Sequence, residues 1–124
     1  MLLSFSAFAG AMEDVLTAYK ANDFKLAVQI AKPLADGGNA IAQSFAGSLL
    51  MDGKGNLQAD AIAAARYLKL CADNQKSKDT TKGECLFVLS IVYMGQPGVP
   101  EDIPLAFSTL WRAARYGNEK AIDQ

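Results

Sequence analysis

The sequence predicts an all-α protein, an α-α superhelix (solenoid) of about three helical hairpins. Three observations predict it: apolar residues recur at spacings of three and four, similar segments recur along the chain, and Gly-bearing turns separate them. Such spacings place apolar residues on one face of a helix. We therefore expect helices over 12–20, 24–36, 40–51, 60–73, 82–94 and 103–116.

The second, fourth and sixth of these helices repeat one pattern, which we call type B. Each copy starts at an Asp, a preferred N-cap residue, and carries small or apolar residues at the same offsets after it. The matched sets are Ala27, Ala64 and Ala106; Ala31, Leu68 and Leu110; Leu34, Cys71 and Ala113; and Ala35, Ala72 and Ala114. The second interval is longer than the first because a polar loop, 74–84, is inserted.

The helices between them share a second pattern, type A, and each runs into a Gly-bearing turn. The two copies overlay with Ala42 on Cys85, Ala46 on Leu89, Leu50 on Tyr93 and Gly55 on Gly98. Small residues at the contact positions let two helices approach closely. Each hairpin then has an apolar flank that the next hairpin covers, which predicts a stack.

Composition limits the functions that the chain can have. It has 124 residues, enough for one domain, and a formal net charge of -1, which offers no basic footprint for nucleic acid. It contains no His, the commonest general base and metal ligand. We therefore expect no catalytic residues, no metal site, no cofactor and no nucleic-acid partner.

The first eleven residues are apolar or small and contain an A-x-A pattern at Ala7 to Ala9. This favours the remnant of a secretory signal peptide, although no Lys or Arg precedes Lys20. The alternative is an N-terminal extension of the first helix. The uncharged run is too short for a membrane span, so we expect none. The repeat domain is expected over residues 12–124.

The repeated pattern resembles the Sel1-like repeat family, whose unit is similar to a tetratricopeptide hairpin. The matching residues are Ala42, Gly47, Gly53, Gly55, Tyr93, Gly98, Val99, Asp102, Ala113, Ala114 and Gly117. The chain departs from the family pattern at Leu50, Asn56, Ser90 and Gln96. The opening of the repeat domain is similar to the entry unit of secreted bacterial members. The resemblance implies a binding scaffold rather than an enzyme.

The two cysteines are expected to meet. Cys71 is near the end of one type B helix and Cys85 near the start of the next type A helix, which adjacent packing brings together. A cysteine-rich branch of the Sel1-like family links neighbouring helices in much this way. A disulfide would suit the oxidising compartment that the N-terminal pattern favours. The alternative is two buried thiols.

A partner surface is predicted on the type A helices. Its residues are Ser44, Ser48, Met51, Phe87, Ile91 and Met94, which lie away from the type B partner in the helical pattern. Apolar residues there favour a groove for a protein or peptide. The alternative is that other helices cover them.

The resemblance implies a non-enzymatic adaptor or regulator of the bacterial envelope, periplasmic or secreted. It would bind a protein or peptide on the concave face of the repeats, and the open terminal repeat could join two copies. The alternative is an envelope hydrolase, an activity sometimes proposed for Sel1-like proteins. Of its candidate nucleophiles, Ser44, Ser48 and Ser90, none has an evident base nearby in the pattern.

Overall fold

The computed structural model describes residues 5–117, with side chains from Gly10 onward. Over these residues the chain forms six helices and no strand: α1 (Phe5–Lys20), α2 (Phe24–Asp36), α3 (Ala40–Asp52), α4 (Ala61–Asp73), α5 (Asp79–Tyr93) and α6 (Ile103–Arg115). Gln96 and Val99 form an isolated bridge within one turn. The predicted all-α class is confirmed.

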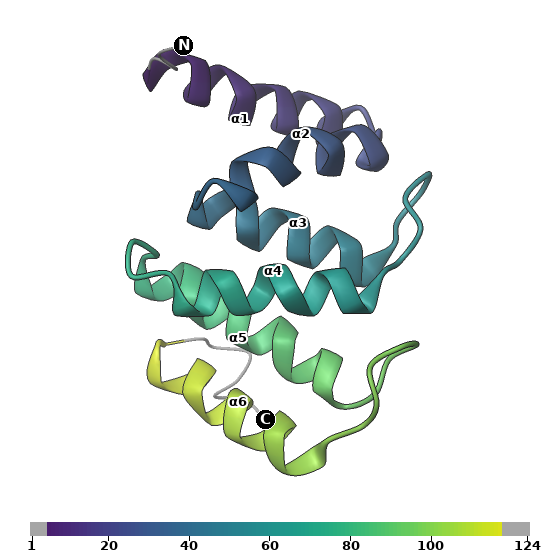
Figure 1. The fold of residues 1–124 in the computed structure, drawn as a ribbon, viewed down its shortest axis with the longest axis vertical. Helices are drawn as coiled ribbons and strands as arrows, with labels where there is room; N and C mark the ends of the chain where they lie inside the picture. Colours follow the sequence, from purple (N-terminus) through teal and green to yellow (C-terminus); the bar gives the residue numbers. More distant parts are fainter. Residues whose placement is uncertain (1–4, 118–124) are drawn as a thin grey trace.

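The helices follow one another along the long axis of the molecule, each lying across that axis (Figure 1). Each helix packs against the next in chain order, and α3 also packs against α5. The type A helices α3 and α5 thus pack against each other, whereas the type B helices α2 and α4 have few contacts. This difference leaves room between α2 and α4.

An Asp caps each of the three type B helices. The side chains of Asp23, Asp60 and Asp102 accept hydrogen bonds from the main-chain N–H groups of Leu26, Ala63 and Leu105 at 3.2, 3.0 and 3.1 Å, respectively. Each bond satisfies one of the N–H groups that have no partner within the first turn of a helix. The cap predicted from the recurring Asp is therefore present in all three copies.

The two turns that join a type A helix to a type B helix share their main-chain bonding. The N–H of Asp60 donates to the carbonyl of Leu50 at 2.8 Å, and the N–H of Asp102 donates to the carbonyl of Tyr93 at 2.8 Å. Leu50 and Tyr93 are the residues that the sequence overlay matched. The two turns therefore leave their helices and enter the next ones in the same way.

A glycine in each turn lies against the preceding type B helix. Gly55 has a φ of 56°, and a Cβ there would lie 2.9 Å from Phe24 of α2. Gly98 has a φ of 84°, and a Cβ there would lie 2.9 Å from Ile62 of α4. Positive φ and close approach both favour glycine. Each hairpin thus nests its turn on the start of the type B helix before it.

Small residues form much of the core. The main core joins α1 to α5 and includes the buried Ala27, Ala31, Ala42, Ala46, Ala64 and Leu68. A smaller cluster, the C-terminal core, has Ala72, Leu86 and Ala113 at its centre, with Phe87, Leu110, Ala114 and Tyr116 packed against it. This second cluster fastens α6 to the rest of the stack.

The Cys71–Cys85 disulfide is present, so the prediction of a disulfide is confirmed. It joins the end of α4 to α5 across 14 residues, with the two Cα atoms 6.2 Å apart. Both cysteines are fully buried. The enclosed turn is fixed further by Ser77, whose hydroxyl donates to the carbonyl of Cys71 at 2.9 Å.

Two predicted helix boundaries were wrong by more than one residue. Helix α5 begins at Asp79 rather than at residue 82, because residues 79–81 continue the helix without the apolar spacing on which the prediction relied. Helix α1 begins at Phe5 rather than at residue 12. Residues 5–11 are therefore the first turns of α1, and their assignment to a leader remnant stays a prediction.

Candidate functional site

The six residues of the predicted partner surface do not form one uniform patch. Ser44 and Ser48 are half-buried on α3, as Ile91 is on α5. Met94 follows α5 and is exposed, with 43% of its surface accessible. Phe87 is half-buried and packs against the C-terminal core. Phe87 therefore contributes to the attachment of α6, as the alternative considered for these residues anticipated.

Ser90, a candidate nucleophile of the hydrolase alternative, lies at the position that Gly47 occupies in α3. Its side chain is fully buried, and its hydroxyl donates to the carbonyl of Phe87 at 2.6 Å. This bond stays within one turn of α5 and engages the hydroxyl proton. Ser90 thus has a structural role in α5.

A groove of about 690 Å³ lies between α2 and α4. We call it the α2–α4 groove. Its residues come from α2, the end of α3, the 53–60 turn, the start of α4 and the 95–101 turn. They include Lys25, Val28, Gln29, Lys32, Leu50, Met51, Asn56, Leu57, Gln58, Asp60, Ala61, Ile62, Gln96 and Pro97.

Met51 is the one residue of the predicted partner surface that lines this groove. The other groove residues were not predicted as site residues. These residues come together because the 53–60 and 95–101 turns pack on the preceding helices α2 and α4. The sequence of a single repeat does not indicate how its turn packs on the repeat before it. The sequence signal for this packing was the recurrence of glycine at Gly55 and Gly98, because these glycines let the turns approach α2 and α4.

The groove combines an apolar base with polar walls. Val28 and Leu50 are buried beneath it, and Met51 and Leu57 are half-buried. Asn56 ties its turn to α2, because its amide donates to Asp23 at 2.8 Å and its carbonyl oxygen accepts from the N–H of Lys25 at 3.1 Å. The wall on this side is thus held in place by hydrogen bonds.

Charges beside the groove are set by neighbouring groups. The hydrogen bond from Asn56, followed by that from the Leu26 N–H, lowers the pKa of the Asp23 carboxyl below its ordinary value.

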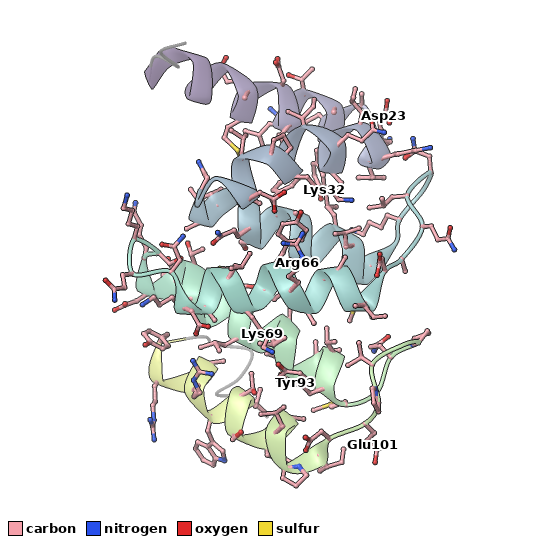
Figure 2. The ribbon with its side chains drawn as sticks, in the orientation of Figure 1. Asp23, Lys32, Arg66, Lys69, Tyr93 and Glu101 are labelled. Carbon is pink, nitrogen blue, oxygen red and sulfur yellow. A yellow bond between two sulfur atoms is a disulfide. The ribbon has the colours of Figure 1, made fainter. Side chains whose placement is uncertain are left out.

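On α4, Arg66 forms an ion pair with Asp36 at 3.4 Å and lies 4.2 Å above the ring of Tyr67. Burial raises the pKa of Tyr67. Figure 2 shows Lys32 on α2 and Arg66 on α4 at the sides of the helices that face each other.

A second apolar surface lies on α6. Phe107 and Trp111 are exposed, with 55% and 70% of their surfaces accessible, and Ile103 continues the same stripe one turn earlier. In α2 the position equivalent to Phe107 is Val28, which is only 2% exposed. Phe107 thus occupies a position that is buried in α2, whereas the α2 residue equivalent to Trp111, Lys32, is exposed. Association of two copies through this terminal repeat stays a prediction.

Among the described residues, no helix has both the length and the apolar character needed to cross a membrane. The same part of the chain has no group of three or more metal-ligating side chains placed to hold an ion. No family model matches the chain, and no curated protein or solved structure is significantly similar to it. The resemblance to the Sel1-like repeat family therefore rests on the sequence pattern.

Proposed function

We propose that the protein is a non-enzymatic scaffold of the Sel1-like, tetratricopeptide-like kind, which holds a protein or peptide partner. Stacked helical hairpins expose extended surfaces rather than enclosed pockets, and such surfaces suit binding to another chain. The partner would be a component of the bacterial cell envelope, as the sequence resemblance implies.

The observation that carries this proposal is the recurrence of one turn geometry. Asp60 and Asp102 make the same main-chain bond, at the same 2.8 Å, to matched residues of the preceding helix. Their φ and ψ angles also agree, at -144° and 89° for Asp60 and at -140° and 87° for Asp102. Equal turns between equal helices support a repeating hairpin, and therefore a scaffold of the repeat type.

The exposed part of the type A helices is one candidate for the partner surface. Ser44 and Ser48 on α3, Ile91 on α5 and Met94 just after α5 remain partly or fully accessible after Phe87 is assigned to the C-terminal core. Met side chains adapt to differently shaped partners. This smaller surface replaces the six-residue surface that the sequence predicted.

The disulfide supports the compartment that we propose. Disulfides persist in oxidising environments such as the periplasm and the exterior of the cell. The Cys71–Cys85 bond therefore supports a periplasmic or secreted location, in agreement with the leader-like pattern at residues 1–11.

Selection followed by measurement with purified components tests the proposal. The immobilised protein is used to select from a peptide display library and from an envelope extract, and each selected partner is remade and titrated by calorimetry. We expect micromolar binding, about −8 kcal/mol, that is weakened by Ser48→Glu with Met94→Glu. The matched control is Gln75→Glu with Thr80→Glu, two exposed residues near the 74–78 turn.

The opposing result is activity without a partner. Turnover of a peptidoglycan or polysaccharide substrate by the purified protein, lost in Ser44→Ala, Ser48→Ala or Ser90→Ala, would establish the hydrolase alternative. Absence of any reproducibly selected protein or peptide would also count against the scaffold.

A further inference from the structure

We infer that the α2–α4 groove binds an extended, acidic segment of a partner protein. The inference rests on the proposed function, because it assigns a site and a chemistry to the partner of that scaffold. It differs from the surface on the type A helices both in its position and in the charge that it requires.

Three glutamines from three separate segments carry the first step of the argument. Gln29 comes from α2, Gln58 from the 53–60 turn and Gln96 from the 95–101 turn, and all three line the groove. Their side-chain amides make no hydrogen bond to another described residue. Each amide can donate and accept, as the main chain of an extended peptide requires.

The base of the groove supplies the second step. Val28, Leu50, Met51 and Leu57 form an apolar strip beneath the amides. In an extended chain, successive side chains point to opposite sides, so every second one can reach such a strip while its neighbours face away. An apolar base with amide-bearing walls thus suits a peptide in extended conformation, in which main-chain groups remain free to bond.

Two lysines supply the charge. Lys25 and Lys32 both line the groove from α2 and make no ion pair with another described residue. The acidic side chain in the groove, Asp60, accepts the N-cap hydrogen bond of α4 and keeps its negative charge. Beside the groove, the carboxylate of Asp23 interacts electrostatically with Lys25. The groove lining thus has two ammonium groups and one carboxylate in a chain whose net charge is -1, and this excess of one positive charge favours a carboxylate-bearing partner.

The lysine spacing indicates where the carboxylates should be. Lys32 follows Lys25 by seven positions in α2, which corresponds to about 10.5 Å along the helix axis. An extended peptide covers that distance with about three residues. Because side chains on one side of an extended chain are two or four residues apart, we expect acidic side chains at one of these spacings in the segment that binds best.

Fluorescence anisotropy with defined peptides tests the inference. The probe is a fluorescein-labelled peptide of about 12 residues with Glu at every second position and Thr and Val between, and the reference peptide has Lys in place of Glu. We expect the full chain to bind the acidic peptide at least about tenfold more tightly than the reference. Raising the salt concentration should weaken this binding.

Variants locate the site. Lys25→Glu with Lys32→Glu should weaken binding of the acidic peptide at least about tenfold. The control, Lys76→Glu with Lys78→Glu, makes the same change of net charge on exposed residues of the 74–78 turn and should change affinity less than about twofold. Gln29→Ala with Gln58→Ala should also weaken binding, which an effect of charge alone does not predict.

Three results would overturn the inference: no binding of the acidic peptide, equal losses in the groove and control variants, or displacement of the peptide by oligogalacturonate that also depends on Lys25 and Lys32. The last result would assign the groove to an anionic glycan. If the groove fails in any of these ways while a partner still binds through Ser48 and Met94, the scaffold function stands and only the groove assignment falls.

Discussion

Gly47 on α3 lies so close to Leu68 on α4 that a Cβ on the glycine would be 2.7 Å from the leucine side chain. Leu68 is fully buried and has little room to move. We expect Gly47→Ala to lower the free energy of unfolding by about 1–2 kcal/mol, because overpacking costs more than the removal of a helical glycine gains. Urea unfolding followed by circular dichroism measures this change.

Gly10 provides the matched control for Gly47. It also lies inside a helix, but among the described residues a Cβ there would have no neighbour within 4 Å. Gly10→Ala should therefore raise the free energy of unfolding by up to about 1 kcal/mol. If both variants were stabilised, the close packing of α3 on α4 would be wrong.

The Cys71–Cys85 bond should contribute substantially to stability. It closes a loop of 14 residues in sequence separation, and a loop of that size corresponds to about 3 kcal/mol. Reduction under denaturing conditions, followed by refolding in reductant, should lower the midpoint of urea unfolding accordingly. Thiol titration of the unfolded, unreduced protein should find no free thiols, and two free thiols would refute the bond.

Replacement of Phe87 and Ile91 by Ser should have unequal effects. Phe87 packs against the C-terminal core, so Phe87→Ser should cost about 2 kcal/mol or more and lower the melting temperature. Ile91→Ser, at a half-buried position outside that cluster, should cost less.

Trp111→Ser is the control for these two variants, because Trp111 is 70% exposed. Its melting temperature should stay close to that of the wild type. A small effect of Phe87→Ser, comparable to that of Trp111→Ser, would restore Phe87 to the partner surface.

The pKa of Asp23 provides a test in solution. Its carboxyl accepts a hydrogen bond from Asn56, the largest cause of the lowered pKa. Since the folded pKa lies below the unfolded one, the contribution to stability is present above the ordinary value of 3.8 and is lost as the pH falls through the folded pKa. In Asn56→Ala, an NMR titration should show the pKa moving back toward 3.8.

Asn74→Ala is the control for this titration. Asn74 donates to the carbonyl of Gly38, in the turn after α2 and therefore at the opposite end of α2 from Asp23. Its removal should leave the pKa of Asp23 unchanged. An unchanged pKa in Asn56→Ala would mean that the bond between the turn and α2 does not form in solution.

Helix boundaries were predictable where the chain marks them locally. Helix α2 runs over the predicted 24–36 because Asp23 caps its start and Gly37 with Gly38 follow its end. Helix α5 was predicted to start too late because its first turn, at Asp79, lacks apolar spacing. Local signals of capping and termination therefore sufficed for the helices that carry them.

The candidate site was far less predictable than the helices. The α2–α4 groove unites Lys25, Gln58 and Gln96 from three distant segments, and their proximity depends on the angle at which successive hairpins stack. Many contacts across the core together determine that angle. The packing of Phe87 against the C-terminal core was also beyond the helical pattern, because it depends on contacts between α4, α5 and α6.

The covalent link between α4 and α5 also sets how far the chain can be drawn out under mechanical tension. If the molecule is pulled from its two ends, the 14 residue steps between Cys71 and Cys85 cannot lengthen while the bond is intact. At about 3.5 Å for each extended residue, the stretched chain falls short of its full contour length by roughly 45 Å. Tension along the chain would therefore pass through the sulfur atoms and leave the 74–78 turn slack.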